Sequence, residues 1–186
     1  MSDSAQPQPD SPTLRSQIDR KLLCALAAEP TRASKADLYQ ALSFVAREKL
    51  AQRWVDTQNT DRDDKARRVY YLSMEFLIGR AMNNALSALD LRDQAAAVFS
   101  GSGPSLDEVM ECEPDAALGN GGLGRLGARF RDSMATLAPP PPGAGGRSAH
   151  RRFVQAILPG QHGGEAEGRP AGGWPGGGPR AQPPPT

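Results

Sequence analysis

A glycine-rich stretch just before a helical pattern is the part of this sequence best suited to chemistry. Residues 119–124 contain four glycines, and apolar residues at helical spacing follow as far as Leu137. Glycine adopts positive φ at little cost and lets a ligand approach the backbone. The first turn of a helix leaves N–H groups unpaired at the positive end of its dipole. The stretch is predicted to bind a phosphate or another anion, with a purely structural turn as the alternative.

The glycine spacing also fits the dinucleotide-binding pattern, but the surrounding residues argue against that interpretation. The dinucleotide motif needs a buried strand immediately before it and an acidic residue about 20 residues after it. Residues 111–118 are rich in acidic side chains and lack β-branched ones, and after Asp132 the next carboxylate is Glu165. No Lys-Ser or Lys-Thr pair closes the glycines, so an ATP-type phosphate loop is not predicted either.

The carboxylate of Glu75 is a second candidate for a functional group. It follows residues 69–72, a β-prone run that predicts a short buried strand. Acidic side chains are rarely buried without a partner, and loops at strand ends often carry function. Glu75 is therefore a candidate to bind a polar ligand, with a structural ion pair as the alternative.

Helical patterns in the first third of the chain are expected to position these groups. Apolar residues at four-residue steps predict a helix over residues 14–27, which Pro30 ends. Ser34 and Asp37 have the spacing of a capping box and open the clearest helix. Its apolar stripe continues to Trp54 and is expected to pack against the rest of the protein.

The middle of the chain predicts shorter elements. Residues 61–68 mix acidic and basic side chains and are expected to form a solvated loop. Two helical pieces follow on either side of Asp90. Ser105 and Glu108 form a second capping box, which opens a short helix that Pro114 ends.

Composition argues against several classes of protein. The 186 residues carry a formal net charge of +1, which gives no field to attract nucleic acid or an anionic membrane. No apolar run approaches the ~20 residues of a membrane-spanning helix, and the N-terminus does not resemble a signal peptide. Cys24 and Cys112 are far apart, and His150 and His162 have no ligand spacing, so no metal site is predicted. A reduced, cytoplasmic setting is expected.

Three stretches, in order, resemble the N-terminal region of the α-glucan (glycogen, starch and maltodextrin) phosphorylases. They are RVYYLSMEFLIGR at residues 68–80, GNGGLGRL at residues 119–126 and DSMATL at residues 132–137. The resemblance implies an α/β fold, the N-terminal part of a two-domain glycosyltransferase. Of that fold, residues 14–137 would supply a partial N-terminal domain that is mostly α-helical with one or two short strands. Its helices are expected to expose apolar faces.

The resemblance also implies a site and an activity. By motif, the sugar and phosphate pocket would be lined by Asn120, Gly121, Gly122, Leu123 and Gly124, with Glu75 near it. The intact enzyme would be a homodimer that uses pyridoxal phosphate to cleave α-1,4-glucan with inorganic phosphate, releasing glucose 1-phosphate. The Schiff-base lysine and the catalytic residues have no counterpart here, so no catalytic residue is assigned. This chain alone is expected to be inactive and not to bind the cofactor. The alternative is a non-catalytic protein that binds a partner or competes for a phosphorylase dimer surface.

Two departures from the family pattern modify these expectations. Arg129 and Arg131 stand where the family prefers small or apolar residues, and burying an unpaired guanidinium is costly. The site is therefore expected to be rearranged or corrupted. Trp54 and Gln58 match the nucleotide effector site of the animal enzymes, but Asp56 stands where an arginine is expected, so activation by AMP is not expected.

The two ends of the chain are predicted to be disordered. Residues 1–13 are polar and proline-rich. Residues 138–186 hold 12 glycines and 11 prolines in 49 positions, and only residues 152–158 look like a short strand. Because the resemblance stops abruptly after Leu137 and returns in part, we interpret the tail as the product of a reading-frame error. A proline-rich binding tail is the alternative.

Overall fold

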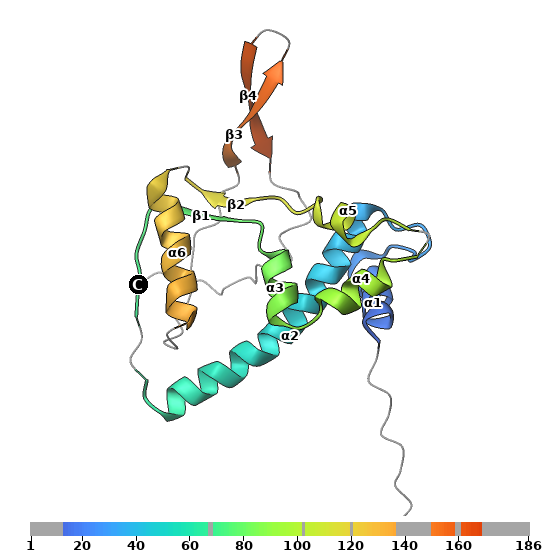
Figure 1. Ribbon diagram of the computed structural model, residues 1–186, viewed down its shortest axis with the longest axis horizontal. Helices are drawn as coiled ribbons and strands as arrows, with labels where there is room; N and C mark the ends of the chain where they lie inside the picture. Colours follow the sequence, from blue (N-terminus) through green and yellow to red (C-terminus); the bar gives the residue numbers. More distant parts are fainter. Residues whose placement is uncertain are drawn as a thin grey trace, which may run out of the picture.

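The computed structural model describes residues 13–66, 69–101, 103–119, 121–136, 150–158 and 161–168, the last two ranges by their backbone alone. In chain order the elements are α1 (Leu14–Leu26), α2 (Lys35–Asp63), β1 (Phe76–Gly79), α3 (Met82–Ala88), α4 (Arg92–Val98), α5 (Leu106–Met110), β2 (Ala116–Leu118), α6 (Gly122–Thr136), β3 (His150–Leu158) and β4 (Gln161–Gly168). Helices α1 to α5 gather into one body, and α6 with β1 and β2 lies to one side of it (Figure 1).

The predicted starts of the first two helices are confirmed. Thr13 caps α1 by accepting from the Ser16 N–H at 3.3 Å. Helix α1 ends at Ala27, whose left-handed backbone (φ 51°) stops it before Pro30. Helix α2 opens with both bonds of a capping box, since the Asp37 N–H donates to Ser34 and the Ser34 N–H donates to Asp37.

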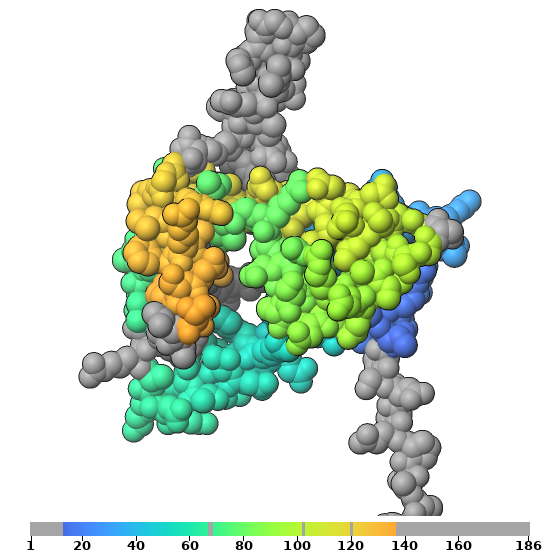
Figure 2. Space-filling model, in the orientation of Figure 1, coloured from blue at the N-terminus to red at the C-terminus, as the bar shows by residue number. Residues whose placement is uncertain are grey.

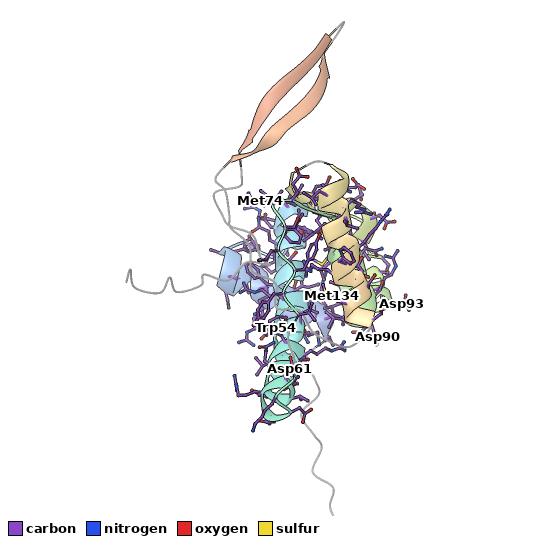
Figure 3. All side chains as sticks on the ribbon, turned by 90° about the vertical axis from the view of Figure 1, so that its left-hand side faces the viewer. Trp54, Asp61, Met74, Asp90, Asp93 and Met134 are labelled. Atoms are coloured by element: carbon purple, nitrogen blue, oxygen red, sulfur yellow. The ribbon has the colours of Figure 1, made fainter. Side chains whose placement is uncertain are left out.

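The mixed-charge loop predicted at residues 61–68 begins too early, because α2 continues to Asp63. Asp61 and Asp63 cost at most about 0.7 kcal/mol each in a helix relative to alanine, which is too little to end it, and Arg62 donates to Asn59 one turn back at 3.3 Å. None of the buried residues of α2 lies beyond Ala46. The second half of the helix, marked by Trp54 and Asp61 in Figure 3, extends away from the other helices.

A single hydrophobic core lies between α1, the first half of α2, and α3 to α5. Its fully buried large side chains are Ile18, Leu22, Leu42, Val45, Leu86 and Val109. The elements β1, β2 and α6 contribute no residue to this core. The core therefore stabilises the helical body and leaves the glycine stretch outside it.

The helical pieces around Asp90 and the second capping box are also confirmed. Asp90 has a left-handed backbone (φ 56°) that separates α3 from α4. Ser105 and Glu108 make both capping-box bonds at the start of α5, which ends at Met110, before Pro114.

The strand predicted at residues 69–72 is wrong. The strand forms seven residues later, as β1, where β2 offers an antiparallel partner with Phe76 opposite Leu118. A lone strand is not stable in water, so the position of the partner decides where pairing occurs. Residues 69–72 are not the buried run that was expected, since the exposed fraction is 71% for Tyr70 and 93% for Leu72.

Residues 14–136 are mostly α-helical with two short strands, as expected. The segment predicted as a disordered tail contains an antiparallel hairpin, β3 and β4 (Figure 1). The strand predicted at residues 152–158 is confirmed within β3. The other residues after 136, and residues 1–12 of the predicted leader, lie outside the described residues.

Candidate functional site

The glycine stretch connects the end of β2 to the start of α6. Gly119 follows β2 with a φ of +88°, a backbone conformation that favours glycine. Asn120 lies outside the described residues, and α6 begins at Gly122, two positions further on. The predicted arrangement of a glycine loop followed by a helix is therefore confirmed.

The structure brings Glu75 to this loop. The Gly121 N–H donates to the Oε2 atom of Glu75 across 3.3 Å. Ser73 fixes the backbone of Glu75 from the other side: its hydroxyl donates to the Glu75 carbonyl at 2.7 Å and accepts from the Glu75 N–H at 3.2 Å. Within the described residues Glu75 makes no salt bridge, so the structural ion pair considered as the alternative is not formed there.

Three glycines in and near the loop are required for steric reasons. A Cβ atom added at Gly119 would lie 2.4–2.7 Å from side-chain carbons of Glu75. A Cβ added at Gly124 would lie 3.1 Å from the Leu77 nitrogen, and one at Gly127 would lie 3.1 Å from the Phe76 ring. Gly124 and Gly127 thus let α6 pack directly on β1, and Gly127 is a packing residue that the sequence analysis missed. Its spacing of three residues from Gly124 is the signal that was available.

Gly122, Leu123 and Gly124 form the first helical turn of α6, whose N–H groups have no acceptor within the helix. No described residue accepts from these three groups. A Cβ at Gly122 would meet nothing within 4 Å, so this side of the loop is open. The turn can therefore donate to a phosphate oxygen or a sugar hydroxyl, next to the carboxylate of Glu75.

The expectation that Arg129 and Arg131 disturb a buried helix face is wrong. Both residues are exposed on α6, as is Arg125. The buried residues of α6 are the small ones, Gly124, Gly127 and Ala128. The two arginines therefore carry no burial cost.

Strand β2 lies directly before the glycine loop, where the dinucleotide interpretation requires a strand. This strand was not expected from the sequence. It is three residues long and pairs antiparallel with β1 in a two-stranded sheet. A dinucleotide site instead needs a parallel strand–helix–strand unit, so the dinucleotide interpretation remains unsupported.

The residues around the loop can be compared in their chemistry with those that hold pyridoxal phosphate or a metal. The four lysines of the chain all precede Ala66. Lys21 pairs with Glu48 and Lys35 with Glu108 in the helical body. No lysine lies in residues 119–124, so the loop itself supplies no amine for an imine-bound cofactor and does not fit that group. Within the described ranges, no three His, Cys, Asp or Glu side chains group into a metal site.

The nucleotide-site match lies apart from the loop. Trp54 is on the second half of α2, with an exposed fraction of 49%, and Asp56 and Gln58 follow it on the same helix.

Among the described helices, none has the length and apolar character needed to cross a bilayer.

Comparison with known proteins gives a consistent result. The family model described as Carbohydrate phosphorylase matches residues 99–168. The glycogen phosphorylase of Pasteurella multocida is 43% identical over 148 residues, which are 80% of this chain and 18% of that protein. The glycogen phosphorylase of Bacillus subtilis is 41% identical over 127 residues (68% and 16%), and the brain form from Bos taurus is 39% identical over 151 residues (81% and 18%).

Two facts about these matches bear on the sequence analysis. The family match runs past Leu137 to residue 168 and includes residues 152–158, where the resemblance was expected to return in part. The chain spans less than a fifth of the length of each of these relatives. The chain is thus similar to the carbohydrate phosphorylases over a short part of their length.

Proposed function

We propose that this sequence forms part of an α-glucan phosphorylase, an enzyme that cleaves α-1,4-linked glucan with inorganic phosphate and releases glucose 1-phosphate. The observation that carries the proposal is the similarity, 39–43% identical over 68–81% of the chain, to proteins named glycogen phosphorylase. The open glycine loop at the start of α6 supports it, because its unpaired N–H groups suit an anionic or hydroxyl-bearing ligand.

In this proposal the glycine loop lines the sugar and phosphate pocket. Gly121, Gly122, Leu123 and Gly124 contribute backbone groups, Asn120 belongs to the same loop, and Glu75 adjoins it. Pyridoxal phosphate acts in the intact enzyme, which is a homodimer, and is held by segments other than the described ones. The 186-residue chain alone neither binds the cofactor nor catalyses the reaction. The setting is cytoplasmic, in keeping with two free cysteines.

The proposal is tested first by the size of the product in cells. An antibody raised against residues 34–60 should detect a protein several times heavier than 19.8 kDa. Lysate depleted with that antibody should lose its phosphate-dependent release of glucose 1-phosphate from glycogen, and the purified 186-residue chain should show none. A single band at 19.8 kDa, with activity that survives the depletion, would contradict the proposal.

A second function is favoured by one observation, the exposed apolar side chains Leu50, Trp54 and Val55 on α2. In this alternative the chain is a non-catalytic fragment that binds the dimer surface of a full-length phosphorylase. Mixing the purified chain with such an enzyme should then convert dimers to mixed species in size-exclusion chromatography, and Trp54→Ala should weaken the effect. Unchanged dimers at excess chain would exclude this alternative.

A further inference from the structure

Glu75 is predicted from the sequence to meet a ligand, but its described contacts are with the chain itself. We propose that Glu75 is a positioning residue, whose carboxylate holds the glycine loop in the conformation from which α6 presents its first N–H groups. The inference rests on the proposed function, because the sugar and phosphate of that proposal are what the loop would meet. It assigns to Glu75 a role that acts through the loop.

A hydrogen bond joins the carboxylate of Glu75 to the glycine loop. Glu75 and Gly121 are 46 positions apart in the sequence, and the bond between the carboxylate and the Gly121 N–H joins the start of β1 to the loop. The carboxylate lies at the positive end of the α6 dipole, where a negative charge is stabilised. No described Lys or Arg forms a salt bridge with it. The loop is thus the partner that the carboxylate has in the described structure.

The Glu75 side chain also packs closely against the backbone of Gly119. The positive φ of Gly119 turns the loop so that its backbone lies against the Glu75 side chain, where any Cβ would overlap the carbons of Glu75. This close fit restricts the loop at Gly119, in addition to the hydrogen bond at Gly121. The lack of a side chain at Gly119 therefore leaves the room that the Glu75 side chain occupies.

Glu75 is itself held in place by its neighbours. Ser73 makes two hydrogen bonds to its backbone. Gly124 lets α6 lie so close that an added Cβ would be 3.4 Å from the Glu75 Cβ atom and 3.1 Å from the Leu77 nitrogen. A carboxylate fixed at its base in this way can transmit its position to the loop, which a freely rotating side chain cannot do.

The test is a measurement of ¹⁵N backbone order parameters in the 186-residue chain without added ligand. In the unmodified chain we expect Gly121 and Gly122 to have order parameters near about 0.85, the value of rigid backbone. In a variant whose loop has lost its contact with residue 75, we expect order parameters below about 0.6. Glu75→Gln keeps an acceptor oxygen at the same reach, so its loop should stay rigid. Glu75→Asp keeps the charge but shortens the side chain, so its loop should become flexible, as in Glu75→Ala.

Glu111→Ala is the matched control, because it removes an exposed carboxylate that pairs with Arg80 at 3.0 Å, away from the loop. Order parameters in α1 should stay unchanged in every variant, because a general loss of stability would lower them there as well. A rigid loop in Glu75→Ala, or a flexible loop in Glu75→Gln beside a rigid one in Glu75→Asp, would overturn the proposal. Since no ligand is added, this result is independent of the glucose 1-phosphate test of the proposed function.

Discussion

At the scale of single residues, two distant carboxylates replace helix caps that the local sequence does not provide. Helix α3 begins at Met82, and its N-cap residue Ala81 has no capping side chain. The carboxylate of Glu113 accepts from the Ala81 and Met82 N–H groups at 2.8 and 3.1 Å. Glu75 serves the loop before α6 in the same manner. Neither partner can be recognised from a capping pattern, because each comes from a remote part of the chain.

Glu113→Ala should lower the free energy of unfolding by about 1–3 kcal/mol, because it leaves two backbone N–H donors without an acceptor at a buried site. Glu113 has an exposed fraction of only 4%. Glu113→Gln, which keeps one acceptor oxygen, should lose less. The midpoint of urea unfolding measures both. Glu111→Ala, at an exposed ion pair, is the control and should change the free energy by less than about 1 kcal/mol. Equal losses at positions 111 and 113 would contradict the assignment.

The two glycines that flank Asn120 and Gly121 should respond differently to alanine. Gly119→Ala should destabilise the chain by at least about 1–2 kcal/mol, because it adds a Cβ at positive φ that overlaps Glu75. Gly122→Ala should be neutral or stabilise it by up to about 1 kcal/mol, because the space there is open and alanine favours a helix. Thermal unfolding gives both values, and the reverse order would show that the loop has another conformation in solution.

At the scale of elements, local signals were sufficient where the element depends on its own residues. Both capping boxes and the break between two helices at Asp90 could be predicted, because these features depend on residues close together in the sequence. The strand could not be placed, because pairing of Phe76 with Leu118 joins segments about forty positions apart. The same holds for the contact of Glu75 with the loop. The glycine loop and its helix were predictable, but what faces them was not.

The capping box of α5 should make stability depend on pH. Hydrogen bonds from Lys35 and from the Ser105 N–H lower the pKa of Glu108, and the ion pair raises the pKa of Lys35. A carboxyl group with a lowered pKa stabilises the fold above its unfolded pKa, and this contribution is lost as the pH falls through the lowered value. Urea midpoints between about pH 5 and pH 3 should therefore fall less steeply in Glu108→Gln. Identical slopes in Glu108→Gln and in the unmodified chain would refute the linkage.

At the scale of the whole molecule, the described residues form one cored body and one unit that lacks a core. Figure 2 shows an opening between α6 and α3 on this face, above α2. Leu123, Leu126 and Phe130 remain exposed on α6, as Leu50 and Trp54 do on α2. The expectation that the helices expose apolar faces is confirmed. Which faces would be exposed was not predictable, because it depends on how little of α6 is covered by β1 and β2.

This difference between the two units predicts unequal protection against hydrogen exchange. Helices α1 and α6 have similar lengths, 13 and 15 residues, but α1 buries Leu14, Ile18 and Leu22 in the core, whereas α6 buries only small residues against a two-stranded sheet. Local opening costs less free energy where few apolar contacts are lost, and such a sheet is marginally stable alone. Backbone amides in the middle of α6 should therefore exchange at least about tenfold faster than those of α1, a difference of about 1.4 kcal/mol in opening free energy. Equal protection of the two helices would mean that α6 shares the stability of the helical body.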